Sequence, residues 1–258
     1  MPMNVLIVVA HPEPQSFNAH LARRARDALV RHGHTTALSD LYAQNFDPRE
    51  AASHFATRRD PACFDPAAEQ RFSWDRQALP ADVRDEVDKI LAADLVVLQF
   101  PLWWFGPPAI LKGWFDRVFV YGGLYTSAQR HDRGVCRGKQ AMLCVTTGSS
   151  AEACSPDGIE GDTQLVLWPT LYTLRYVGFT VRRPHLIHGV RSGLVGAEAQ
   201  AQTRRLAVEA EQLAERLLDV QRTPVVPFNT DDDWDEDGKL RASAPVHGPF
   251  IRRGQNWQ

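Results

Sequence analysis

Paired cysteines, long apolar runs and an excess of charge of one sign are all missing from this sequence. Its four cysteines, Cys63, Cys136, Cys144 and Cys154, include no Cys-x-x-Cys pair, so we expect free thiols and no metal site. The longest strongly apolar run, residues 5–10, is far shorter than the roughly 20 residues of a membrane span. No signal-peptide pattern precedes that run. We therefore expect no transmembrane segment and a cytoplasmic protein.

The charges nearly cancel, with 29 Lys and Arg against 31 Asp and Glu and a formal net charge of −2. This balance excludes the basic footprint of a general nucleic-acid-binding protein, so we expect no nucleic-acid partner. Hydrophobic residues make up 44% of the 258 positions and charged residues 23%. That composition is typical of a globular protein with a substantial core.

Five short apolar segments alternate with helical patterns along the chain. Buried strands are expected at residues 4–10, 35–38, 95–100, 140–146 and 179–186, because each is a short apolar run. Helices are expected at residues 17–32, 82–92, 108–119 and 162–176, and around 206–217, where apolar residues recur with a period of 3.6. This alternation predicts an α/β fold, a doubly wound five-stranded parallel sheet with helices on both faces.

Two segments break this pattern. Residues 43–80 have no clean period and are interpreted as a long excursion over the surface with local turns, functional or interface-forming. Residues 221–258 are rich in proline and include six acids among the seven positions 231–237. We therefore predict one folded domain at residues 1–220 and an irregular C-terminal tail at residues 221–258. The tail is either solvated or draped over a partner, or else it is an acidic recognition element.

Ligands of an open α/β sheet bind outside the carboxyl ends of its strands, where three loops of this chain should converge. The first loop places Ser16, Phe17 and Asn18 at a helix N-terminus, which suits a phosphate, although Ser16 would equally serve as a helix cap. The second carries three consecutive aromatic residues, 103–105, interpreted as walls for a planar ligand or else as core or a dimer contact. The third, residues 147–151, is rich in glycine and serine, so backbone amides can approach a polar ring edge.

These segments resemble those of the flavodoxin-like NAD(P)H:quinone oxidoreductases, the DT-diaphorase family. The resemblance covers roughly residues 4–190. It rests on His11 with Ser16-Phe-Asn18, Ser39-Asp-Leu-Tyr42, Gln99-Phe-Pro-Leu-Trp-Trp-Phe-Gly106, Pro108-Ala-Ile-Leu-Lys-Gly-Trp-Phe-Asp-Arg-Val-Phe119, Thr146-Thr-Gly148, Gly158-Ile-Glu-Gly-Asp162 and Leu167-Trp-Pro169.

The resemblance implies a flavodoxin-like catalytic domain and a homodimer with one flavin per subunit, FAD with FMN as the alternative. The diphosphate and adenosine side would be contacted by His11, Ser16, Phe17 and Asn18. The isoalloxazine and ribityl chain would lie against Pro101, Leu102, Trp103, Trp104 and Phe105, and against Thr146, Thr147, Gly148 and Ser149. Trp104 and Phe105 would also wall the pocket for nicotinamide and quinone, which Tyr125 would reach from the partner subunit.

The implied reaction is a ping-pong, two-electron transfer of hydride from NAD(P)H through FAD to a quinone or similar planar acceptor. Azo dyes and nitroaromatics are alternative acceptors. Two other functions fit the same fold. One is a flavodoxin-type electron carrier with FMN, and the other is a flavin-bound regulatory subunit of a membrane transport system, with the tail as its docking segment.

The sequence departs from this family at two positions. Where the family has a Tyr after the Thr-Thr-Gly loop and a His six residues later, this chain has Cys154 and Glu160. The resemblance implies that the family pair stabilises or protonates the N1–C2=O2 edge of the flavin. Either a protonated Glu160 replaces it as the acid, or the loop turns both side chains away and backbone N–H groups around Gly148 and Ser149 act alone. We favour the second, and keep Cys154 as a candidate cofactor contact and Glu160 as a candidate catalytic residue.

Overall fold

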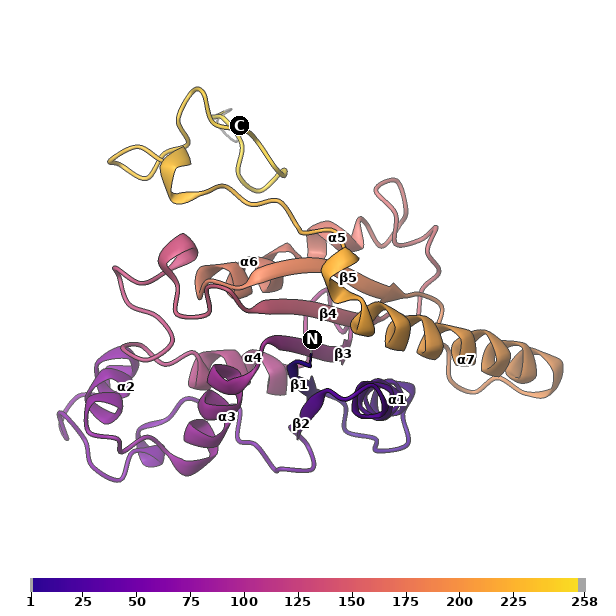
Figure 1. Cartoon of the computed structure of the whole chain (residues 1–258), viewed down its shortest axis with the longest axis horizontal. Helices are drawn as coiled ribbons and strands as arrows, with labels where there is room; N and C mark the ends of the chain where they lie inside the picture. Colours follow the sequence, from indigo (N-terminus) through magenta and orange to yellow (C-terminus); the bar gives the residue numbers. More distant parts are fainter. Residues whose placement is uncertain (1, 255–258) are drawn as a thin grey trace.

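A five-stranded parallel sheet forms the centre of the molecule (Figure 1), as seen in a computed structural model that describes residues 2–254. The strands lie in the order β2-β1-β3-β4-β5, and every neighbouring pair is parallel. Their bounds are β1 (Asn4–Val9), β2 (Thr35–Asp40), β3 (Leu95–Pro101), β4 (Gln140–Thr146) and β5 (Thr180–Ile187). The predicted fold class is confirmed, and the predicted strands end within two residues of the observed ones.

Helices cover both faces of the sheet because alternate side chains of each buried strand point in opposite directions. Ile7 of β1 packs in one apolar cluster with residues of α1 (Phe17–Arg31) and α7 (Gly196–Leu218). Leu6, the preceding residue, packs in a second cluster with residues of three other helices. These are α3 (Ala81–Ala92), α4 (Ala109–Val118) and α6 (Trp168–Tyr176). The core is thus two layers of side chains, one on each face of the sheet.

The helix predicted at residues 162–176 is two helices, so that prediction was wrong in its continuity. A short helix, α5 (Thr163–Val166), begins where the Asp162 side chain accepts a hydrogen bond from the Gln164 N–H, and α6 begins at Trp168. Pro169 causes the break, because it has no N–H to donate and its ring would crowd the carbonyl group four residues before it.

The excursion over residues 43–80 contains more regular structure than the local turns predicted. It includes a 3-10 turn, η1 (Ala52–His54), and a helix, α2 (Pro66–Asp75). The helix begins with a strong local signal, since Asp65 caps it by accepting from the Ala68 N–H at 3.1 Å and Pro66 takes its first position. Its buried side chains are Glu69, Gln70 and Ser73. Because these are polar, no apolar period marks the helix in the sequence.

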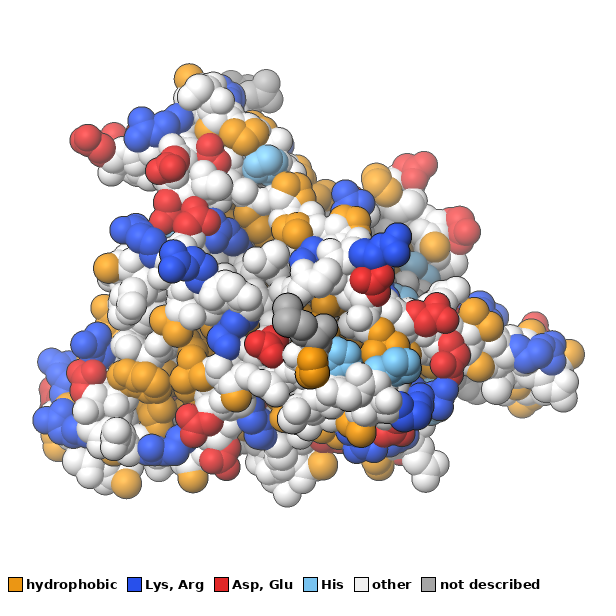
Figure 2. All heavy atoms as spheres, in the orientation of Figure 1, with side chains coloured by type: hydrophobic (Ala, Val, Ile, Leu, Met, Phe, Trp, Pro, Cys, Tyr) orange, Lys and Arg blue, Asp and Glu red, His pale blue; other side chains and the backbone are white. Residues whose placement is uncertain are grey.

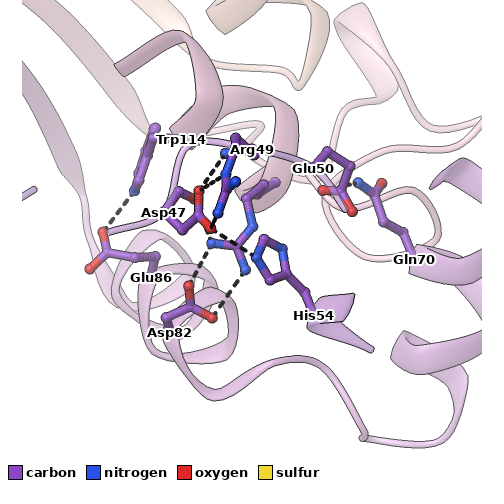
Figure 3. Close-up of polar contacts among 9 residues, drawn as sticks. Asp47, Arg49, Glu50, His54, Gln70, Asp82, Glu86 and Trp114 are labelled. Carbon is purple, nitrogen blue, oxygen red and sulfur yellow. Dashed lines mark hydrogen bonds and ion pairs between the residues drawn. The ribbon is translucent and has the colours of Figure 1, made fainter. Parts of the chain in front are cut away.

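A cluster of polar side chains holds the first part of this excursion against α3 and α4 (Figure 3). Arg117 of α4 donates to Asp82 of α3 at 2.6 Å and to the backbone carbonyl of Asp47 at 2.8 Å. The Asp47 carboxylate accepts two hydrogen bonds from Arg49, at 3.0 and 2.8 Å, and its Oδ2 lies 3.2 Å from His54 Nε2. The hydrogen bonds from Arg49 hold the pKa of Asp47 well below its usual range.

The C-terminal segment extends above the sheet at the top of Figure 1 and contacts other parts of its own chain. After η3 (Val220–Arg222), the Val226 N–H donates to the Val181 carbonyl of β5 at 2.8 Å. The acidic turn η4 (Asp231–Asp233) is tied to the body by an ion pair from Arg133 to Asp231, and Phe250 stacks on Trp168 with ring centroids 4.6 Å apart. Residues 221–254 are therefore held by specific contacts, and the other four residues of the predicted tail lie outside the described residues. The division at residue 220 stays a prediction.

Acidic and basic side chains are interspersed over the face shown in Figure 2, as the near-zero net charge leads one to expect. None of the helices that the structure describes is long and apolar enough to cross a membrane. Within residues 2–254, no group of three or more His, Cys, Asp or Glu side chains is arranged to hold a metal ion.

Candidate functional site

The strand order places the switch point of the fold between β1 and β3. The chain passes from β1 to β2 on one side and then to β3 on the other, and such a reversal leaves a crevice at the carboxyl ends of the two strands. The loops that follow them touch there, since the His11 and Trp103 rings lie 5.8 Å apart. The loop after β4 joins them, because the Leu102 N–H donates to the Thr146 carbonyl at 2.8 Å. The predicted convergence of these loops is confirmed.

The aromatic loop after β3 is a tight turn that presents its rings outward. Trp103 and Gly106 exchange two backbone hydrogen bonds of 3.0 Å, and the residues between them have φ angles of 50° (Trp104) and 60° (Phe105). Turns of this kind normally carry Asn-Gly, because side chains at positive φ are strained. The Trp104 side chain is nevertheless 96% exposed and that of Phe105 56%. Strain and exposure of two large apolar rings together indicate a surface made for a ligand or a partner.

Backbone hydrogen bonds to the end of β5 and to the residues after it hold the loop after β4 in place. The Thr147 N–H donates to the Ile187 carbonyl at 3.0 Å, and the Gly189 N–H donates to the Ser149 carbonyl at 2.8 Å. This brings the Thr147–Ser149 backbone opposite the aromatic turn.

A cavity of about 250 Å³ lies between these two loops. Its lining consists of Leu102, Trp104, Phe105, Thr147, Gly148, Ser149, Cys154, Glu160, Thr163 and Val166. The structure therefore brings eight of the predicted site residues to one place. Sites that enclose a whole drug-sized ligand measure about 300 Å³ or more. This cavity thus suits the flat ring system of a larger molecule, with apolar rings on one wall and backbone polar groups on the other, and these residues fit a flavin ring.

Cys154 and Glu160 both contribute to this lining, so the prediction that the loop turns both side chains away was wrong. Ser149 Oγ donates to Glu160 Oε1 at 3.2 Å, and Cys154 Sγ lies 4.0 Å from Thr147 Oγ1. Glu160 is exposed while Cys154 is buried. The thiol therefore borders the cavity from within the protein and the carboxylate borders it from the rim.

The residues predicted to hold the diphosphate lie at the start of α1. Ser16 caps the helix, its hydroxyl accepting from the Ala19 N–H at 3.2 Å, as predicted for a cap. Phe17 is the first helical residue and is partly buried. The Asn18 side chain is instead used inside the protein, accepting from Gln99 at 2.7 Å and donating to Thr146 Oγ1 at 2.9 Å. Asn18 and Thr146 thereby join the three loops beneath the cavity, and their direct contact with a cofactor stays a prediction, as it does for Pro101 and Trp103.

Tyr125 does not reach the aromatic turn of its own chain. It lines a second and larger cavity of about 620 Å³, with Phe119, Tyr172 and Tyr176, and the two cavities share no lining residue. Burial raises the pKa of the Tyr125 phenol above its usual value. A role for Tyr125 at the 250 Å³ cavity therefore requires a second copy of the chain.

Sequence reasoning missed His188, the first residue after β5. Its Nδ1 lies 2.9 Å from Thr147 Oγ1, directly behind the wall of the cavity. The rule that selected the other loops would have found it, because it follows a parallel strand at the same edge of the sheet.

The fold and the two facing loops define a flavodoxin-like α/β protein, and the family model described as flavodoxin-like fold matches residues 3–215. Human ribosyldihydronicotinamide dehydrogenase (quinone) is 42% identical over 205 residues, which cover 76% of this chain and 89% of the relative. Guinea pig NAD(P)H dehydrogenase (quinone) 1 is 43% identical over 187 residues, covering 72% of this chain and 68% of the relative.

Similarity also extends to the C-terminal segment. A solved structure from Klebsiella pneumoniae, assigned as a quinone reductase, superposes with a TM-score of 0.84 at 33% identity, covering 99% of this chain and 98% of that one. The chain therefore belongs to the flavodoxin-like NAD(P)H:quinone oxidoreductase family.

Proposed function

We propose that this protein is a flavin-dependent NAD(P)H:quinone oxidoreductase that transfers two electrons as hydride, in ping-pong order, to a quinone or similar planar acceptor. The observation that carries this is the 250 Å³ cavity at the carboxyl ends of β3 and β4. A bound flavin would supply the redox chemistry there. The chain itself supplies a flat slot that orients the reactants, with Trp104 and Phe105 on its open side.

FAD fits the arrangement better than FMN because a second anion-binding feature lies beside the cavity. The first turn of a helix leaves N–H groups without partners inside the helix, and its positive dipole end attracts phosphate. In α1 the Ser16 hydroxyl takes the N–H of Ala19, so those of Phe17 and Asn18 are available to a diphosphate. His11, whose Nδ1 accepts from the Glu13 N–H at 3.0 Å, borders the same edge.

The test is direct. The purified protein should be yellow, mass analysis of the released flavin should give FAD, and oxidation of NADH or NADPH should be stimulated by menadione. A panel of quinones, azo dyes and nitroaromatics then ranks the acceptors. Absence of bound flavin, or a bound flavin with no acceptor-stimulated oxidation, would refute the proposal.

A homodimer completes the proposed active site. The Trp104 and Phe105 rings are exposed in a single chain, and the larger cavity with Tyr125 is open and mostly lined by apolar and aromatic side chains. A two-fold pair would cover both surfaces, since an isologous contact places the same elements on each other in both directions. We therefore predict a dimer in sedimentation at micromolar concentration. A monomer that retains its full complement of flavin would contradict it.

A further inference from the structure

His188 touches the flavin-binding loop through a single hydroxyl group. Its Nδ1 lies 2.9 Å from Thr147 Oγ1, and the same hydroxyl lies 2.9 Å from the Ser149 carbonyl oxygen. Thr147 and Ser149 line the cavity proposed to hold the flavin ring. The imidazole therefore acts on the cavity wall through Thr147.

The number of protons decides which of these hydrogen bonds can form together. A hydroxyl has one proton and can donate it to only one acceptor. When Nδ1 carries a proton, it donates to Thr147 Oγ1, and the hydroxyl is free to donate to the Ser149 carbonyl. When Nδ1 carries no proton, it competes with the Ser149 carbonyl for the one hydroxyl proton of Thr147, and one of the two hydrogen bonds is lost. The observed distances are thus satisfied together only by a ring with Nδ1–H, whether neutral or cationic.

We infer that His188 is a positioning residue of the active site, which fixes the Thr147–Ser149 turn through its Nδ1–H and couples that turn to the charge in the cavity. This inference rests on the proposed flavin site. It also bears on the two positions where this chain departs from the family, Cys154 and Glu160. The chain lacks an imidazole on the loop before α5, yet one reaches the same cavity wall from the end of β5.

The surroundings of His188 set the pH at which its charge changes. Burial lowers the pKa of the imidazole below 6.5, while the carboxylates of Glu152 and of Glu209 on α7 oppose that shift. On the same side Arg205 donates to the Gly189 carbonyl at 2.8 Å. The ring therefore takes up its proton only in more acidic solution than a solvent-exposed imidazole does. A cation behind Thr147 then favours the negative charge that arrives in the cavity with two electrons.

Two substitutions separate the hydrogen bond from the charge. His188→Asn keeps an N–H close to the place of Nδ1 but cannot titrate, whereas His188→Gln carries its amide one bond further out. Thr147→Val removes the shared hydroxyl. The matched control is Thr203→Val, which removes a hydroxyl that bonds to the Ala199 carbonyl on the exposed surface of α7.

The measurements are flavin release on dilution of each holoprotein and the midpoint potential of the bound flavin in a series from pH 8 down to the lowest pH at which the holoprotein stays folded. We expect H188Q and T147V to release flavin about fivefold more readily than the unchanged protein, the effect of one lost hydrogen bond. The double variant should release flavin no more readily than either single variant. H188N and T203V should bind as the unchanged protein does. At pH 8 H188N should match the unchanged potential. At the acidic end of the series, where His188 of the unchanged protein has taken up its proton, the potential of H188N should be lower by about 30 mV, which corresponds to a tenfold ratio for two electrons.

The outcomes distinguish this inference from the proposal beneath it. An unchanged protein that holds no flavin refutes the proposed function. A protein that holds flavin, but in which H188Q behaves like T203V, refutes the positioning role. Equal potentials of H188N and the unchanged protein over the whole pH series refute the coupling to charge, and this comparison stands even if H188Q does not fold.

Discussion

Replacing Trp104 by alanine separates the stability of the fold from the affinity of the site. Because the side chain is 96% exposed, its removal takes almost no apolar area from the core. We expect the free energy of unfolding of the flavin-free chain to change by less than about 0.5 kcal/mol. Alanine also keeps a side chain at φ 50°, so the strain of the turn is retained. A flavin ring would lose one stacking face, a cost on the order of 1 kcal/mol or more and thus about fivefold in binding.

The assay compares denaturant unfolding, flavin binding and stopped-flow rates of reduction by NAD(P)H and of reoxidation by several quinones. Val195→Ala is the matched control, since Val195 is 80% exposed and lies outside the lining of the cavity. W104A should slow both half-reactions while V195A changes neither. Unchanged flavin affinity and turnover in W104A would remove Trp104 from the active site. A large loss of stability would show that its ring packs in the fold.

Four further substitutions test the core and the site. Trp114→Phe removes the indole N–H that donates to Glu86 at 2.9 Å (Figure 3), and we expect unfolding in denaturant to become easier by about 1–3 kcal/mol because both groups are buried. Burial lowers the pKa of His185 to about 4, so the folded state resists a proton that the unfolded state takes up below about pH 6.5. Stability should then fall by up to roughly 3 kcal/mol between pH 6.5 and 4, and His185→Leu should flatten that profile. Glu160→Gln should change the stopped-flow rate of flavin reduction less than threefold, because the carboxylate borders the cavity only at its exposed rim. Cys154→Ser should do little, because a hydroxyl takes the place of a weakly donating thiol. A tenfold drop in Glu160→Gln would show instead that Glu160 is the acid.

The sequence by itself determined the sheet and the location of the site. Buried parallel strands appear in a sequence as short apolar runs, such as residues 95–100. This signal is local, because both faces of each strand are covered and consecutive residues are therefore apolar. The order of strands and helices then places the loops after β1, β3 and β4 at one edge, since connections between parallel strands have a fixed hand. The aromatic run at residues 103–105 was conspicuous because three large apolar side chains have no use in a solvated loop.

Only the tertiary structure decided the features that depend on contacts between distant residues. The helix α2 buries Glu69, whose carboxylate pairs with Arg58 at 2.9 Å. The inner face of α2 therefore has no apolar periodicity from which the helix could be predicted. The C-terminal segment is held by partners about 45 to 100 residues away, among them Val181, Trp168 and Arg133. His188 meets Thr147 across 41 positions. Apolar periodicity is a property of neighbouring residues, whereas a hydrogen bond, an ion pair or a ring stack forms between whichever side chains the folded backbone brings together.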